Sequence, residues 1–458
     1  MRSLIGRVAK IFKHKIVENI LALSGLHILN YVFPLVTVPY LTRVLGPAAW
    51  GLVAFYQGFA SFIVYFVEFG FNWSSTREIA RLRDSPRSLA DIMSGVLGAK
   101  SLLSVVGVAV ALLAYLFVPP LQADTTLIVM SVVWALGQAF NMIWFFQGLE
   151  RMRVVALLTT AAKVVTTIAI FIVVRSPSDA WKVMALQASA AWFAVGTAAF
   201  IAYKGVPFRR PSMALTIHAL RSSWSLFLFN SSRSLYTVGN AFILGLFASS
   251  RVVGFYAAAE KLIRVLLGLL NPISRAIYPR VSYLVHHSPE RALRLVRLTF
   301  LGMTGFGALI SLAVAVFAPL IVRVALGADF GPAIPILRVS SLLPFIVAPS
   351  IVLGTHWMLP LGHDRPYLKM VFLAGLVNVT LAVALAPTFA GTGMAWAVVS
   401  TETFVTVIVY SWLKRRRLDP LGGTAALDQL VLTGRFNDPA VGPESGSAAS
   451  ERVTGGGD

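Results

Sequence analysis

The stretch NYVFPLVTVPYLTRVLGPAAWGLVAF, residues 30–55, decides the fold class of this chain. It joins two apolar runs, and each run continues for about the 20 residues that a helix needs to cross a membrane. Between the runs, Gly46-Pro47 is a turn signal, so we expect two membrane helices joined by a tight turn. Pro34 and Pro39 lie inside the first run, where each removes a backbone N–H and bends the helix. Such a bend is either a moving gate or a static kink that fills a packing slot, and the sequence leaves both open.

The composition of the whole chain indicates an all-α integral membrane protein. Of its 458 residues, 57% are hydrophobic and 13% are charged, and the mean hydropathy is +0.77. A soluble core cannot bury that much apolar surface. The net charge of +20 does not point to nucleic acid here, because the basic residues lie between the apolar runs. The chain has no cysteine, which excludes a thiol nucleophile and a cysteine metal site, and we expect no metal and no cofactor.

The loops predict how the chain crosses the membrane. About twelve apolar segments follow one another, each long enough to span a bilayer. The loops alternate in charge, with about five basic residues on one side for each one on the other, so we expect both termini in the cytoplasm. The first apolar segment is too long for a signal peptide and is expected to stay as a span. The expected parts are a basic N-terminus (1–16), a first bundle (17–203), a cytoplasmic linker (204–219), a second bundle (220–413) and a disordered cytoplasmic tail (414–458).

Weak internal similarity suggests that the two bundles repeat each other. Gly51-Leu52-Val53-Ala54 opens one span after a short outer turn, and Gly254-Phe255-Tyr256-Ala257 opens another in the same way, at an offset of about 200 residues. We therefore expect two bundles of about six helices each, related as a parallel repeat about an axis normal to the membrane. Such pairs form alternating-access transporters that hold the substrate between the bundles.

Ionisable residues inside the apolar runs mark the candidate cargo site, because each is costly unless it faces a partner or a wet cavity. Cations outnumber acids there, which favours an anionic cargo over an organic cation. The cations expected in the lumen are Arg233, Lys261, Lys163, Arg264 and Lys100. The acids, which are the candidates for ion coupling, are Glu68, Glu402 and Glu260.

Three of these charges have a simpler interpretation. Glu260 and Arg264 are four residues apart on one expected helix, so they could pair with each other and leave the cargo aside. Glu68 lies near the inner end of its span and could be an interfacial residue. Asn30 precedes Arg233 by the same offset that separates Gly51 from Gly254, so we include Asn30 as a polar lumen residue.

Three stretches resemble the Wzx-type polysaccharide flippases, which belong to the same exporter superfamily as MATE drug exporters and lipid II flippases. They are PLVTVPYLTRVLGPAAWGLVAF (34–55), FGFNWSSTREIAR (69–81) and AIYPRVSYL (276–284). The resemblance covers the predicted bundles in length and order, and it leaves out the tail from about residue 418.

The resemblance implies a flippase of the bacterial inner membrane. Such a protein moves an undecaprenyl-pyrophosphate-linked glycan, the repeat unit of an O-antigen or exopolysaccharide, from the inner to the outer leaflet, and a polysaccharide polymerase is an expected partner. It has a MATE-like, V-shaped cationic lumen between its two bundles. Arg233 and Lys261, with help from Lys163, would offset the desolvation of the pyrophosphate. The gate would consist of Pro34 and Pro39, which let the first span bend, and of the outer turn formed by Gly46, Pro47 and Gly51.

Two alternatives stay open. A drug or ion antiporter on the same fold would need acids in its cavity and would tolerate the loss of basic residues. A membrane glycosyltransferase or polymerase would usually need a sizeable outer loop, and no outer loop here exceeds roughly a dozen residues. No pair of carboxylates, histidine cluster or Ser-His-Asp set stands out, so we expect no catalytic residues and not an enzyme.

Overall fold

The computed structural model describes the backbone of residues 2–422 and the side chains of residues 33–227 and 238–422. The described chain is helical throughout and contains no strand. Its elements are α1 (Arg2–Glu68), α2 (Phe71–Leu82), α3 (Pro86–Phe117), η1 (Pro119–Ala123), α4 (Thr125–Ala139), α5 (Ile143–Gly148), α6 (Met152–Val173), η2 (Pro177–Asp179), α7 (Ala180–Tyr203), α8 (Met213–Thr237), α9 (Asn240–Gly245), α10 (Ser250–Gly268), α11 (Leu270–His287), α12 (Pro289–Ala325), η3 (Ala328–Phe330), α13 (Ala333–Ser340), α14 (Leu343–Ser350), the π-helix η4 (Ile351–Met358) and α15 (Asp364–Arg415).

Local sequence signals set many of the helix ends. The side chain of Ser85 accepts a hydrogen bond from the amide of Ser88 at the start of α3, and Pro86 occupies the first helical position. Asp124 caps α4 in the same way, accepting from the amide of Leu127 at 2.9 Å. Gly327, with φ 104°, ends the turn that follows α12 because a side chain would be strained there.

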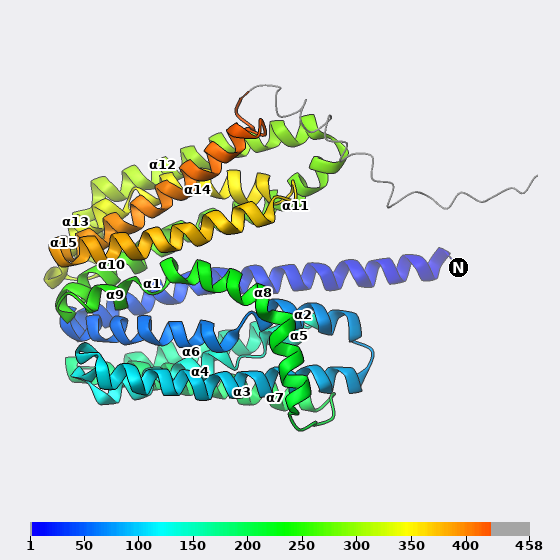
Figure 1. Ribbon diagram of the computed structural model, residues 1–458, viewed down its shortest axis with the longest axis horizontal. Helices are drawn as coiled ribbons and strands as arrows, with labels where there is room; N and C mark the ends of the chain where they lie inside the picture. Colours follow the sequence, from blue (N-terminus) through cyan, green and yellow to red (C-terminus); the bar gives the residue numbers. More distant parts are fainter. Residues whose placement is uncertain (1, 423–458) are drawn as a thin grey trace, which may run out of the picture.

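Eight segments of the described chain are long and apolar enough to cross a membrane. Two of them contain a sharp break: α1 leaves helical geometry at Gly46 (φ 69°, ψ 175°) and α15 at Ala390 (φ 50°, ψ −130°). Figure 1 shows the chain turning back on itself within each of these two helices. The turn expected at Gly46-Pro47 is therefore present, and the fold class is confirmed as an all-helical membrane protein. The count of about twelve spans stays a prediction.

The helices form two groups, which Figure 1 shows one above the other. We call the lower group, α1 to α7, the N-lobe, and the upper group, α9 to α15, the C-lobe. Helix α8 connects the groups and packs against both α3 and α15. It begins at Met213, inside the segment that the sequence assigns to a linker. The ribbons of the two lobes lie together at one end and diverge at the end where the N-terminus lies.

The ordered C-lobe extends past its expected boundary at residue 413. The indole Nε1 of Trp357 donates to the carbonyl oxygen of Leu418 at 2.7 Å, and Nε of Arg297 donates to that of Pro420 at 2.5 Å. The first residues of the expected disordered tail therefore pack against the C-lobe. The rest of that tail, from residue 423, lies outside the described residues.

At the end where the lobes meet, they pack backbone against backbone. A Cβ atom on Gly51 of α1 would overlap the carbonyl oxygen of Ser250, and one on Gly254 of α10 would overlap the carbonyl oxygen of Pro47. The contact is reciprocal, because the offset that relates Gly51 to Gly254 also relates Pro47 to Ser250. Equivalent residues meet in this way when they lie close to a two-fold axis. We call these four residues the outer contact, because the loop charges predict that this end of the molecule faces outward.

Candidate functional site

A cavity of about 490 Å³ lies inside the N-lobe, and this volume is typical of a pocket for a small molecule. We call it the N-lobe cavity. Its walls come from α1, α4, α5, α6 and α7, and one residue, Lys261, comes from α10 of the C-lobe. Pro34, which the sequence assigns to the gate, lies on its wall. The cavity therefore sits behind the first span and opens onto the boundary between the lobes at Lys261.

Two lysines, one from each lobe, reach the N-lobe cavity. Lys163 of α6 and Lys261 of α10 both line it, and both are half-buried. The ammonium nitrogen of Lys261 also lies 5.9 Å from the ring centroid of Trp50, where the π-electrons attract a cation. None of the described residues on the cavity wall is acidic. The described wall therefore carries two basic side chains and no acidic one.

Neutral amides provide much of the remaining polar surface. Gln57 of α1 donates through Nε2 to Oε1 of Gln187 of α7 at 2.7 Å, a bond that links two walls of the cavity. This bond leaves the Gln57 oxygen and the Gln187 nitrogen for other partners, since a primary amide carries two donors and an acceptor. Gln138 and Asn141 line the cavity as well. We call these four residues the amide wall.

The amide wall includes a break between helices α4 and α5. Residues 140–142 are not helical, and the Asn141 side chain stabilises the break at both ends. Its Nδ2 donates to the carbonyl oxygen of Gln138 at 2.7 Å, and its Oδ1 accepts from the amide of Ile143 at 3.2 Å. Irregular backbone at membrane depth occurs only where protein buries it or where it lines a cavity, and here it lines one.

Lys100 lies behind this break and not on the cavity wall. Its side chain is completely buried, and its ammonium group donates to the carbonyl oxygens of Ala139 (2.6 Å) and Asn141 (3.3 Å). The nitrogen also lies 5.8 Å from the ring centroid of Trp144. The sequence assigned Lys100 to the lumen, but here its charge is taken up by carbonyls that the broken helix leaves without partners.

The three acids also lie away from the cavity wall. Glu68, at the end of α1, is buried, accepts from the amide of Asn72 at 3.1 Å, and interacts electrostatically with Lys100. Glu402 lies half-buried on α15. Glu260 pairs with Arg264 at 2.8 Å, so the ion pair considered in the sequence is present. The charge of Arg264, which lies on the same helix as Lys261, is therefore already paired with Glu260.

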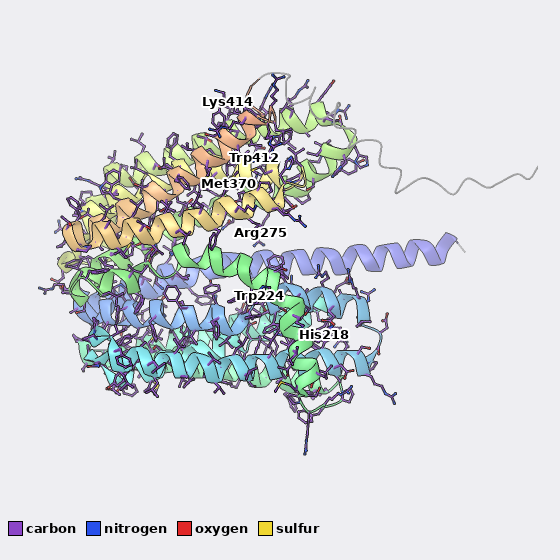
Figure 2. All side chains as sticks on the ribbon, viewed as in Figure 1. His218, Trp224, Arg275, Met370, Trp412 and Lys414 are labelled. Atoms are coloured by element: carbon purple, nitrogen blue, oxygen red, sulfur yellow. The ribbon has the colours of Figure 1, made fainter. Side chains whose placement is uncertain are left out.

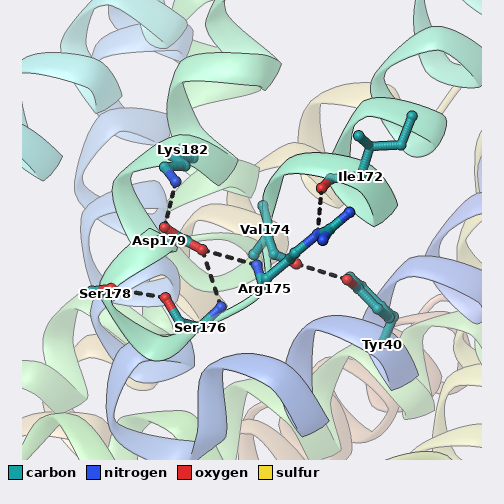
Figure 3. Close-up of polar contacts among 8 residues, drawn as sticks. All are labelled: Tyr40, Ile172, Val174, Arg175, Ser176, Ser178, Asp179 and Lys182. Carbon is teal, nitrogen blue, oxygen red and sulfur yellow. Dashed lines mark hydrogen bonds and ion pairs between the residues drawn. The ribbon is translucent and has the colours of Figure 1, made fainter.

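The segment of α1 before Gly46 is fixed to other helices of the N-lobe. Figure 3 shows Tyr40 donating to the carbonyl oxygen of Val174 at 2.7 Å, at the end of α6. In the following turn, Asp179 accepts from the amides of Arg175 and Ser176 and from the ammonium group of Lys182. Arg43, three residues after Tyr40, donates instead to the carbonyl oxygen of Val324 in the C-lobe. The segment before Gly46 is thus bonded to both lobes.

Several expected residues have other positions. The side chains of Arg233 and Asn30 lie outside the described residues. Pro39 lies within α1 but does not line the cavity.

Arg275 is an exposed cation of α11 that was not among the expected residues, and Figure 2 shows it, with Trp224 of α8, toward the ends at which the lobes diverge. The amide wall was missed too, because ionisable residues, with Asn30 as the one exception, were treated as the signals of a lumen. Neutral amides inside apolar runs would have revealed it.

Comparison with known proteins gives one family and one fold. The family model for polysaccharide biosynthesis proteins matches residues 16–285. A protein of Escherichia coli (strain K12) named "Putative O-antigen transporter" is 30% identical over 406 residues, which are 88% of this chain and 97% of that protein. A protein of Shigella dysenteriae with the same name is 29% identical over 87% of this chain and 100% of its own length.

Two solved structures show the same fold. The lipid II flippase MurJ in an inward closed conformation superposes with a TM-score of 0.64 at 13% identity, covering 91% of each chain. The eukaryotic MATE transporter AtDTX14 gives a TM-score of 0.53 at 14% identity, covering 91% of this chain and 97% of its own. At these identities the likeness is one of fold.

Proposed function

The chain belongs to the family of polysaccharide biosynthesis proteins, and on that premise we propose that it is a flippase for a lipid-linked glycan. Its cargo is an oligosaccharide on undecaprenyl pyrophosphate, the repeat unit of an O-antigen or exopolysaccharide, which it moves from the inner to the outer leaflet. The observation that supports this anionic cargo best is that Lys163 and Lys261 both line the N-lobe cavity, and that the described residues of its wall include no acidic one.

The lysines address the largest energetic obstacle to this transport. The pyrophosphate must leave water, and the idealised cost of moving an ion into a low-dielectric interior is on the order of 20 kcal/mol. Cations within the protein offset that cost, while the prenyl chain stays in the bilayer. Because Lys261 belongs to α10 of the C-lobe and Lys163 to α6 of the N-lobe, a pyrophosphate between them would contact both lobes. Arg233 remains a third candidate for the same role.

The arrangement of the lobes supports an alternating-access mechanism. The outer contact closes one end, and by the distribution of basic loops the diverging ends face the cytoplasm, together with both termini. Cargo would enter from the cytoplasmic leaflet of the inner membrane, and the outer contact would part to release it. A polysaccharide polymerase would receive the product on the outer side.

The membrane potential favours this direction of transport. Moving two negative charges out of a negative interior is worth roughly 4–5 kcal/mol per 100 mV. Because the membrane potential already drives the anion outward, export does not require coupling to an ion gradient. Glu402 remains the candidate if a proton is coupled, whereas Glu68 is bonded to an amide and lies near Lys100.

A test in cells uses Lys261→Met. In cells that lack the gene, complete lipid-linked repeat units should accumulate on the cytoplasmic leaflet, as measured by mass spectrometry with a label added from outside. The wild-type gene should release them. Lys261→Met should release them at least about tenfold more slowly, because a hydrogen bond to a charged group is worth about 1.5–3 kcal/mol.

The matched control is Lys204→Met, which removes a lysine that lies over the ring of Phe200 and does not line the cavity. It should behave as wild type. Normal export in the deleted cells, together with a changed tolerance to toxic cations, would contradict the flippase and support the drug antiporter.

A further inference from the structure

The amide wall is built for a ligand that is neutral and rich in hydrogen-bonding groups. Gln57 and Gln187 meet across the cavity, and Gln138 and Asn141 face it from the broken helix. Threonine hydroxyls add to this surface on the two neighbouring elements: Thr37 lies on α1, and Thr159, Thr166 and Thr167 lie on α6. The amides both donate and accept hydrogen bonds. The hydroxyls of Thr37, Thr159 and Thr166 donate to carbonyl oxygens of their own helices and offer acceptors to a ligand. None of these groups carries a charge.

This chemistry excludes two other kinds of ligand. An organic cation would need a carboxylate, and the described residues on the wall include none. A purely apolar ligand would desolvate the Gln57 oxygen and the Gln187 nitrogen, which their mutual hydrogen bond leaves for other partners, and this is costly in a buried site. A sugar offers hydroxyls to amides, and its C–H faces pack on aromatic rings. Trp134 and Phe146 provide such rings on the same wall.

We propose that the amide wall is a saccharide-binding subsite, which holds a sugar of the cargo while Lys163 and Lys261 hold the pyrophosphate. The inference rests on the proposed function, because the pyrophosphate places the sugar beside the wall. The size of the cavity supports it: about 490 Å³ suits a small-molecule ligand and leaves the rest of a long glycan outside. The bond between Gln57 and Gln187 would open to accept the sugar hydroxyls.

The test compares the binding of two lipids to the purified full chain in nanodiscs. One probe is polyprenyl pyrophosphate, and the other is the same lipid carrying one N-acetylhexosamine. Dissociation constants are measured by native mass spectrometry. The wild type should bind the glycosylated lipid at least about tenfold more tightly, since a site built to hydrogen-bond hydroxyls rejects a ligand that lacks them.

The decisive variant is the double replacement Gln57→Leu with Gln187→Leu. Removing both partners of a hydrogen bond together leaves neither one unsatisfied, so the fold should survive. The variant should bind polyprenyl pyrophosphate as the wild type does and should lose the preference for the sugar. Gln147→Leu is the matched control, because Gln147 is exposed on α5 and does not line the cavity.

The outcomes separate this inference from the proposed function. Equal binding of the two lipids by the wild type would overturn the saccharide subsite alone. A preference that survives in the double variant would also overturn it. If the wild type binds neither lipid, both the subsite and the flippase are wrong.

Discussion

Lys100 carries its charge in the interior of the N-lobe, where main-chain carbonyls take the place of water around its ammonium group. The carbonyls belong to Ala139 and Asn141, at the break that separates α4 from α5. Glu68 supplies a nearby negative charge. Lys100 therefore supports the amide wall from behind, and we expect its role to be structural.

Replacing Lys100 by methionine tests this role. The change leaves two carbonyls without a donor and leaves Glu68 buried without its opposite charge. Leaving a buried acceptor without its donor typically costs about 1–3 kcal/mol. The free energy of unfolding, measured by denaturant titration of the purified protein, should fall by about this amount.

Two further variants sharpen the result. Lys204→Met should change the free energy of unfolding by less than about 0.5 kcal/mol, as surface substitutions usually do. Lys100→Met combined with Glu68→Gln should recover part of the loss, because the unpaired negative charge is gone. A Lys100→Met protein as stable as the wild type, with reduced binding of polyprenyl pyrophosphate, would return Lys100 to the cargo site.

At the scale of residues, the sequence predicted which charged residues are buried better than it predicted which groups they contact. Lys163 and Lys261 were expected in a lumen between the bundles. Both line the N-lobe cavity, and their place in such a lumen stays a prediction. Lys100 was expected there too. Its position in an apolar run shows that it is buried, but it does not show which groups the side chain contacts. Its partners are backbone carbonyls that become available only where α4 breaks, and no glycine or proline marks that break between residues 139 and 143.

At the scale of elements, helix α1 has the decisive geometry. It contains Pro34, Pro39 and Pro47, yet the only residue inside it with non-helical backbone angles is Gly46, where the chain turns back. Five residues later, Gly51 packs against the backbone of α10 so closely that no side chain fits. The glycine at this position permits the lobes to meet.

Gly51→Ala should open the outer contact. The added methyl group would overlap the carbonyl oxygen of Ser250, and overpacking of this kind costs about 1–3 kcal/mol, enough to shift a two-state equilibrium. Because the chain has no cysteine, spin labels can be attached at Ala48→Cys and Arg251→Cys, two exposed positions beside the contact. Pulsed electron spin resonance should show a longer distance between the labels in Gly51→Ala than in the parent.

The control for this experiment is Gly302→Ala. Gly302 lies on α12, and a Cβ atom there would meet no other atom within 4 Å. It should leave the label distance unchanged. An unchanged distance in Gly51→Ala as well would show that the outer contact does not hold the lobes together.

The ends and turns of the helices were predictable where glycine and proline mark them, and they were less predictable elsewhere. The turn at Gly46-Pro47 follows from its dipeptide. The reversal inside α15 at Ala390 is marked in the same way, by Pro387 before it and Gly391 after it. The π-helix at Ile351–Met358 was not predicted, because a local pattern does not report contacts between distant segments. For the same reason, the sequence could not reveal that helix α8 packs on both lobes.

At the scale of the whole molecule, the reciprocal outer contact links the repeat to the mechanism. Two bundles related by an axis normal to the membrane must meet at equivalent residues near that axis. Gly51 and Gly254, paired in the sequence by their short motifs, do meet there. The fold class was predictable from the hydropathy of the apolar segments and the charge of the loops. The position of the cavity did not, because it depends on which faces of α1, α4, α6 and α7 are brought together.

The most direct test of the central claim is flipping in vesicles that contain only the purified protein and an undecaprenyl-pyrophosphate-linked oligosaccharide. A lectin added outside measures how fast the glycan appears on the outer leaflet. With an inside-negative potential set by a potassium gradient and an ionophore, and with no proton or sodium gradient, the wild type should expose it faster than protein-free vesicles, and a Lys163→Met, Lys261→Met double variant should not. A wild-type rate equal to that of protein-free vesicles would contradict the flippase, and a double-variant rate equal to wild type would contradict the cationic site.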